Sequence, residues 1–268
     1  MSIIACIPTH NRNFAERVAW ALSPQVDHIL IHAGGKCEWS SSLPKNCIVR
    51  WGNTSIVMSR NFMSQYAIKN GFDYWICCED DTTHIQPNHV LDMLEVLDSE
   101  QALGAITSIS RMLAHASETI ASNKPFTIRN SLAMFWITRT KVQAEMGRFA
   151  NVFFDDIEMG QRMWSQGYMI AHLTDPTKGR HDCSGSNIKA KAGGGVTKQQ
   201  QSKKRLRECC EYLMQHYGGR GVRIAKPTKV KYGQRGARIY MRYNLEEMIR
   251  PVVDRWGTIG YQDRRISF

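Results

Sequence analysis

Over the first two-thirds of the chain, short apolar runs alternate with segments in which apolar residues recur at helical spacing. The runs predict buried strands at Ile3–Pro8, Asp27–His32, Cys47–Trp51, Tyr74–Cys78, Gly104–Ile109, Leu132–Thr138 and Met169–Leu173. The helical spacing predicts helices ending near Leu22, over Ser55–Asn70, from Pro87 to about Ser99, and from Asp155 to Gly167. Strands that alternate with helices are typical of an α/β domain with a mostly parallel sheet.

The last third of the chain has a different pattern. Thr174–Thr197 is rich in Gly, Ser, Lys and Asp, and is too long for an ordinary connection, so we expect a lid or a linker there. Lys198–Tyr217 predicts a helix with a basic first half. Arg220–Phe268 alternates basic with apolar or aromatic residues and predicts short strands. We therefore expect a domain over residues 1–185 and a basic C-terminal extension over 186–268.

Charge divides the chain at the same place. Residues 1–185 hold 16 Lys and Arg against 18 Asp and Glu, a net charge of −2, whereas residues 186–268 hold 19 against 6, a net charge of +13. Such an excess predicts a polyanionic partner for the extension, or a well-solvated basic surface. Tyr and Gly, rather than Glu, are interleaved with the basic residues, and this favours the partner.

Composition excludes several classes. No apolar run is long enough to span a bilayer. The eight cysteines form no C-x-x-C pair, which disfavours a zinc site or a disulfide framework and predicts a reduced, cytoplasmic protein. The sequence has no G-x-G-x-x-G and no G-K-[ST], which counts against a dinucleotide oxidoreductase and a P-loop NTPase.

The most informative segment is the strand Tyr74–Cys78, which runs directly into Glu79, Asp80 and Asp81. Packed like charges repel unless a cation lies among them. At the carboxyl end of a strand in an open α/β sheet, such a cluster faces the crevice where ligands bind. Carboxylate oxygens suit Mg²⁺ or Mn²⁺, with substrate phosphates completing the coordination. The alternative is a polar turn that solvates or caps the next segment.

The order of motifs resembles the GT-A fold of nucleotide-sugar-dependent glycosyltransferases. The opening Ile3–Arg12 is similar to the family's first strand and nucleotide-binding turn, Ser59-Arg60-Asn61 to its Arg-Asn pair, and Glu79-Asp80-Asp81 to its D-x-D metal motif. The block from Ile137 to Tyr168, which includes Asp155-Asp156, resembles the acceptor side with its E-D dyad. The resemblance covers about residues 1–183 and implies a Rossmann-like α/β sheet flanked by helices.

The resemblance also implies roles for individual residues. Mn²⁺ or Mg²⁺ would be held by Asp81, Glu79 and His181, and Asp156 would be the general base toward an acceptor hydroxyl. A UDP-sugar donor would be contacted by Pro8, Thr9, Arg12, Arg60, Asn61, Glu79, Asp80, Lys178 and Arg180. Glu79 stands where the family has Asp, so its reach differs by one methylene.

Several of these residues also have structural interpretations. His181 can be an ordinary loop histidine, and Arg60 a surface charge on a helix. Asp155 is a natural N-cap with Glu158 as its capping-box partner, although capping needs only one acid and the sequence supplies Asp156 as well. For Trp136 and Trp164, core packing is favoured over stacking on a ligand.

The acceptor follows less directly from the residues. A core of net charge −2 joined to an extension of net charge +13 suits double-stranded DNA. The pattern resembles the TET-associated glycosyltransferases of bacteriophages, which implies hydroxymethylcytosine in phage DNA as acceptor and the host cytoplasm as location. The alternatives are a polysaccharide, lipid or protein acceptor, a nucleotidyltransferase, and a non-catalytic nucleic-acid-binding protein on a GT-A scaffold.

Overall fold

The computed structural model describes most of the region up to residue 173 and parts of the remainder. The described residues are 1–10, 12–35, 43–82, 85–108, 126–129, 131–132, 134–152, 155–173, 203–217, 222–224, 228–229, 235–241, 261–262 and 265–267. The segment Thr174–Thr197, and with it Lys178, Arg180 and His181, lies outside the described residues, as does the side chain of Arg12.

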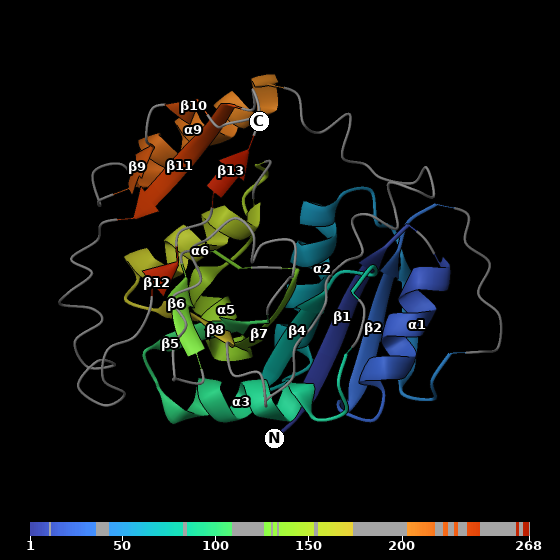
Figure 1. Cartoon of the computed structure of the whole chain (residues 1–268). Coiled ribbons are helices and arrows are strands. Elements are labelled where there is room, and N and C mark those ends of the chain that lie inside the picture. Colours follow the sequence, from blue (N-terminus) through green and yellow to red (C-terminus); the bar gives the residue numbers. More distant parts are fainter. Residues whose placement is uncertain are drawn as a thin grey trace.

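A nine-stranded sheet forms the centre of the molecule, in the order β12-β6-β8-β5-β7-β4-β1-β2-β3 (Figure 1). Its strands are β1 (Ile3–Thr9), β2 (His28–Ala33), β3 (Cys47–Trp51), β4 (Tyr74–Cys78), β5 (Leu103–Thr107), β6 (Phe126–Arg129), β7 (Phe135–Arg139), β8 (Met169–Leu173) and β12 (Tyr261–Gln262). The predicted α/β class and mostly parallel sheet are confirmed, because β3, β2, β1 and β4 all run parallel. β7 is antiparallel to both of its neighbours, β4 and β5.

Helices cover both faces of this sheet. They are α1 (Arg12–Leu22), α2 (Ile56–Lys69), α3 (His89–Ser99), α5 (Thr140–Met146), α6 (Asp155–Ser165) and α9 (Lys203–Tyr217). Gln25, just after α1, accepts from the backbone N–H of Val90 in α3, so α1 and α3 lie together on one face. α2 contacts α5, and α5 contacts α6, so these three helices form the other layer, and α9 packs on α6 beside the smaller sheet (Figure 1).

The remaining strands form a small antiparallel sheet. They are β9 (Val222–Ile224), β10 (Thr228–Lys229), β11 (Arg235–Met241) and β13 (Arg265–Ser267). These are the short strands that the sequence predicted. The division of the chain at residue 185 stays a prediction. Described elements on its two sides contact each other, since β12 pairs with β6 and α9 packs on α6.

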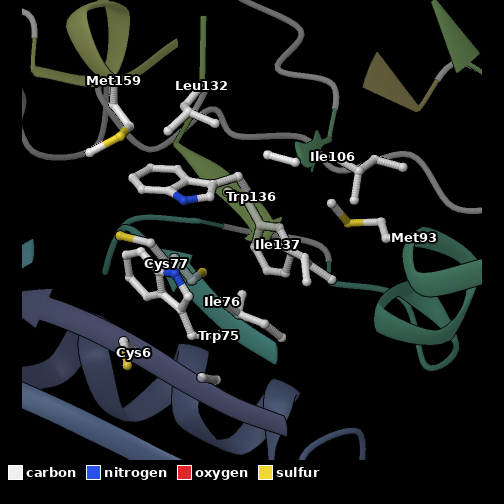
Figure 2. Packing of buried hydrophobic residues seen from close by; sticks show 14 of the residues in the cluster. Cys6, Trp75, Ile76, Cys77, Met93, Ile106, Leu132, Trp136, Ile137 and Met159 are labelled. Atoms are coloured by element: carbon white, nitrogen blue, oxygen red, sulfur yellow. The ribbon is translucent and has the colours of Figure 1, made fainter. Parts of the chain in front are cut away.

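Two buried tryptophans lie where β4 meets β7. Trp75 and Trp136 meet edge to face with ring centroids 6.0 Å apart, and both are fully buried. Figure 2 shows the Trp136 indole between the side chains of Trp75 and Met159, the latter from α6. The expected core role of Trp136 and Trp164 is confirmed, since neither exposes more than 1% of its surface.

Candidate functional site

The acid cluster lies at the carboxyl end of β4, as the sequence predicts. The backbone N–H of Glu79 donates to the carbonyl of Met134 at 2.9 Å, which extends the β4–β7 ladder by one residue. Asp80 and Asp81 follow in the turn and are 1% and 2% exposed, whereas the Glu79 side chain is 27% exposed. The sheet thus fixes the backbone of Glu79, the first of the three consecutive acids.

Thr9, at the end of β1, holds one of these acids. Its hydroxyl donates to Asp80 Oδ2 at 2.6 Å, and both side chains are buried. β1 and β4 are parallel neighbours, so their carboxyl ends meet at one edge of the sheet. The sequence placed Thr9 and Asp80 together as donor contacts, and the structure brings them together. Pro8 is buried one residue earlier in β1, opposite His32 of β2. Their contact with a donor stays a prediction.

The guanidinium of Arg60 is buried beneath the acid cluster. Nη2 donates to Glu79 Oε1 at 3.1 Å, and Nη1 donates to both carboxylate oxygens of Asp155 at 2.7 Å. The side chain is 4% exposed. The alternative of a surface helix charge is therefore wrong, and the expected contact of Arg60 with a donor stays a prediction. Arg60 can be buried because the carboxylates of Asp155 and Glu79 compensate its charge.

Asn61 holds the segment that leads to α6. Its side chain donates to the carbonyl of Phe149 at 3.1 Å and accepts from the Phe149 N–H at 2.7 Å. Both polar atoms of the amide are therefore engaged by one backbone residue. The structure gives Asn61 a scaffolding contact, and its expected contact with a donor stays a prediction.

Asp155 and Asp156 form the first turn of α6 and are 2% and 8% exposed. Burial raises the pKa of Asp155, the Arg60 guanidinium lowers it, and neighbouring Asp156 raises it again; the net shift is upward. The backbone carbonyl of Asp156 accepts from the N–H of Leu132 at 3.3 Å, which ties this turn to the residues preceding β7. A general-base role for Asp156 stays a prediction.

The capping box predicted for α6 is wrong. Glu158 is completely buried, and its oxygens accept from Arg162 at 2.7 and 2.8 Å and from the Tyr217 hydroxyl at 2.5 Å. Asp155 directs both of its oxygens to Arg60. Pairing with a guanidinium satisfies a buried carboxylate better than a single backbone N–H does. The sequence pattern cannot show that Asp155 pairs with Arg60 of α2, or that Glu158 accepts from Tyr217 of α9.

The residues at the edge of the sheet fit a divalent cation by donor type, since Asp81 and Glu79 offer hard carboxylate oxygens. Among the described residues, no group of three His, Cys, Asp or Glu side chains could hold a metal ion by itself. A cation at Asp81 would therefore take further ligands from substrate phosphate or from residues such as His181.

No helix among the described residues is long and apolar enough to cross a membrane.

Comparison with solved structures places this sheet in a known architecture. The mannosyltransferase PcManGT from Pyrobaculum calidifontis, solved with GDP-Man and Mn²⁺, superposes with a TM-score of 0.53 at 11% identity, over 66% of the present chain and 55% of that chain. The chain has a GT-A fold. A mycobacterial protein superposes with a TM-score of 0.55 at 12% identity, over 93% and 88% of the two chains. No protein-family model and no curated protein matches the sequence.

Proposed function

We propose that this GT-A protein is a metal-dependent glycosyltransferase that moves a sugar from a nucleotide-sugar donor to a hydroxyl acceptor. The observation that carries the proposal is the meeting of two acid groups at one edge of the sheet. The cluster Glu79–Asp81 ends β4, Asp155-Asp156 begins α6, and Arg60 contacts one acid of each. PcManGT, which shares the fold, was solved with GDP-Man and Mn²⁺.

The chemistry assigns a task to each acid. Asp81 and Glu79 would hold Mn²⁺ or Mg²⁺, which when bound would stabilise the charge that builds on the diphosphate leaving group. Asp156 removes the proton of the acceptor hydroxyl as its oxygen bonds to the anomeric carbon. The bond from that carbon to the diphosphate oxygen breaks, and the nucleoside diphosphate departs. Thr9 holds Asp80 at 2.6 Å and so fixes the middle of the cluster.

The experiment measures nucleoside diphosphate released from UDP- and GDP-sugars with Mn²⁺. We expect Asp81→Ala to lower turnover by ~10³-fold, because it removes a ligand of the cation that stabilises the leaving group. Asp156→Asn should keep donor affinity and lower turnover by ~10²–10⁴-fold. Asp98→Asn is the control, because Asp98 is 43% exposed and pairs with Tyr74 and Arg139 on the surface.

Full activity of Asp81→Ala in a folded protein would contradict the metal assignment. Turnover that survives in Asp156→Asn would show that another base acts. EDTA should abolish activity, and added Mn²⁺ should restore it.

For the acceptor, we propose a polyanion, with hydroxymethylated cytosine in duplex DNA as the specific candidate. The support is the net charge of +13 over residues 186–268, and it comes from the sequence. Nucleoside mass spectrometry of hydroxymethylated DNA, incubated with the donor and Mn²⁺, tests the candidate directly. Transfer to water only, with DNA unmodified, would contradict it and leave the donor proposal standing.

A further inference from the structure

One buried cation joins two parts of the site that are far apart in sequence. Arg60 lies 19 residues before Glu79 and 95 residues before Asp155, and its guanidinium binds both. Nη1 lies 2.7 Å from each oxygen of Asp155, and Nη2 lies 3.1 Å from Glu79 Oε1. The contact therefore spans α2, the end of β4 and the start of α6.

The surroundings of Arg60 fix its orientation. Its Cζ atom lies 4.9 Å from the ring centroid of Trp136, which is fully buried and itself packs on Trp75. A guanidinium above an indole is held by the ring quadrupole as well as by its ion pairs. The side-chain amide of the next residue, Asn61, donates to the backbone carbonyl of Phe149 and accepts from its N–H. Two consecutive residues of α2 thus bind the start of α6: Asn61 binds Phe149, which precedes the helix, and Arg60 binds Asp155, its first residue.

The charge of Arg60 is required where it lies. Burial lowers the pKa of Arg60, but nearby acidic groups reverse this and the net shift is upward. These groups come from two elements: Asp155 and Asp156 of α6, and Cys77 and Glu79 at β4. Without the cation, the buried carboxylate of Asp155 would lose its compensating charge, which is strongly unfavourable.

We infer that Arg60 is a positioning residue for sugar transfer: by binding Asp155 and Glu79 at once, it sets where Asp156 lies relative to the acid cluster after β4. The inference rests on the proposed function. In this role Arg60 acts through its two carboxylate partners, Asp155 and Glu79. Asp156 is the residue after Asp155 in the same helical turn, so a displacement of Asp155 moves the base directly.

Arginine suits this position better than lysine. The planar fork offers several N–H donors in fixed directions and can bridge two carboxylates, whereas an ammonium is a point charge on a flexible stem. Arg60→Lys keeps the charge and loses the fork. It therefore separates compensation of charge from positioning.

The experiment compares Arg60→Lys, Arg60→Met, Asp155→Asn and the double variant Arg60→Met/Asp155→Asn. Each is measured for kcat, donor KM and the unfolding equilibrium. Arg60→Lys should fold like the parent, with kcat lowered by at least ~10-fold and donor KM little changed, because a misplaced base slows chemistry more than donor binding. Arg60→Met should lose stability sharply. The double variant should regain stability because one uncompensated carboxylate is gone, yet keep a low kcat.

Arg162→Met is the matched control. Arg162 also pairs with a buried carboxylate of α6, Glu158, and donates to the carbonyls of Met146 and Arg148. Its loss should lower stability while kcat of the folded enzyme stays close to that of the parent.

Two results would overturn the inference. One is a parental kcat in Arg60→Lys. The other is recovery of kcat together with stability in the double variant, which is what a purely structural ion pair predicts. An inert parent chain would instead remove the proposed function, and the transfer role with it. In that case the unfolding measurements would still report the coupling between Arg60 and Asp155. The unfolding equilibrium constant of the double variant should differ by at least ~10-fold from the value that adding the two single-variant effects predicts.

Discussion

At the scale of single residues, polar side chains at the carboxyl ends of β1 and β2 hold one another in place. The His32 Nδ1 atom lies 2.7 Å from the Ser59 hydroxyl, and the imidazole stacks on Phe62 with centroids 4.4 Å apart. The Asn53 amide donates to the carbonyls of Thr9 and His32, at 3.2 Å each. The ends of the two strands are therefore locked by side chains as well as by the sheet.

His32 makes the stability of this corner depend on pH. Burial lowers the pKa of His32, and the nearby His10 lowers it further. The unfolded chain therefore binds a proton more readily than the folded chain does. The contribution of His32 to stability is present above its unfolded pKa of about 6.5 and is lost as the pH falls through the lower, folded pKa.

The prediction is that His32→Gln flattens the acid side of the stability curve. Between about pH 7.5 and about pH 5, the melting temperature of the variant should fall less than that of the parent, because no imidazole has to be kept neutral. His28→Gln is the control, since His28 is exposed at the start of β2. A variant curve that follows the parent throughout would show that His32 can be protonated without cost.

The same scale shows what the sequence could and could not predict. Tyr74–Cys78 and the acids after it were located correctly, because an apolar run followed by charges is a local signal. The ligands of Arg60 and Glu158 were not foreseen. Helical spacing shows which face of a helix is buried, but Asp155 lies 95 residues from Arg60, and Tyr217 lies 59 residues from Glu158. Only the fold brings such partners together.

At the scale of elements, α9 packs on α6 and also makes a buried hydrogen bond to it. Leu213 is fully buried and Cys209 nearly so, and the Tyr217 hydroxyl donates to Glu158. Burial raises the pKa of Tyr217, and its hydrogen bond to Glu158 raises it further, so the phenol stays protonated and can donate. Glu158 is held on its other side by Arg162. The helix that carries Asp156 is thus clamped from the side of the C-terminal extension.

We predict that Tyr217→Phe destabilises the protein by about 1–3 kcal/mol, because the hydrogen bond to a buried carboxylate is lost. Chemical denaturation of the parent and the variant measures the difference. Tyr212→Phe is the control on the same helix, as Tyr212 is only partly buried and stacks on His216. Equal stability of Tyr217→Phe and the parent would mean that Arg162 satisfies Glu158 without help.

At the scale of the whole molecule, described parts of the last third contact the first two-thirds through α9, which packs on α6, and through β12, which pairs with β6 of the sheet. β6, like α5, escaped the sequence interpretation, because short strands and helices carry too few residues to show a period. β12 lies within Arg220–Phe268, where short strands were predicted. β6 pairs with β8 and with β12, and so connects the basic extension to the nine-stranded sheet. The change of charge at residue 185 comes from the sequence, and the division of the chain there stays a prediction.

Two truncations separate these contributions. Removing residues 218–268 takes away a net charge of +8 but keeps α9 on α6, so we expect a folded protein that still hydrolyses the donor. Its affinity for duplex DNA should fall less steeply with salt than that of the parent, since fewer phosphates are neutralised. Removing residues 203–268 also deletes α9 and so exposes the face of α6 that α9 covers, and we expect this shorter protein to aggregate.

Fluorescence anisotropy with labelled duplex, measured from low to physiological salt, gives the two slopes. Identical slopes for the parent and the 218–268 deletion would place any DNA contact elsewhere in the chain.

The position of β7 also constrains how the protein reaches its native state. β7 lies between β4 and β5, two strands that precede it in the chain, and the pairing of Cys78 with Phe135 immediately adjoins the acid cluster. Nonlocal pairings of this kind form slowly, because a long loop must close before any contact compensates it. Glu79 and Asp155 can share Arg60 only after this insertion. Refolding from urea should therefore regain helical circular dichroism well before it regains affinity for Mn²⁺, and added Mn²⁺ should leave the refolding rate unchanged.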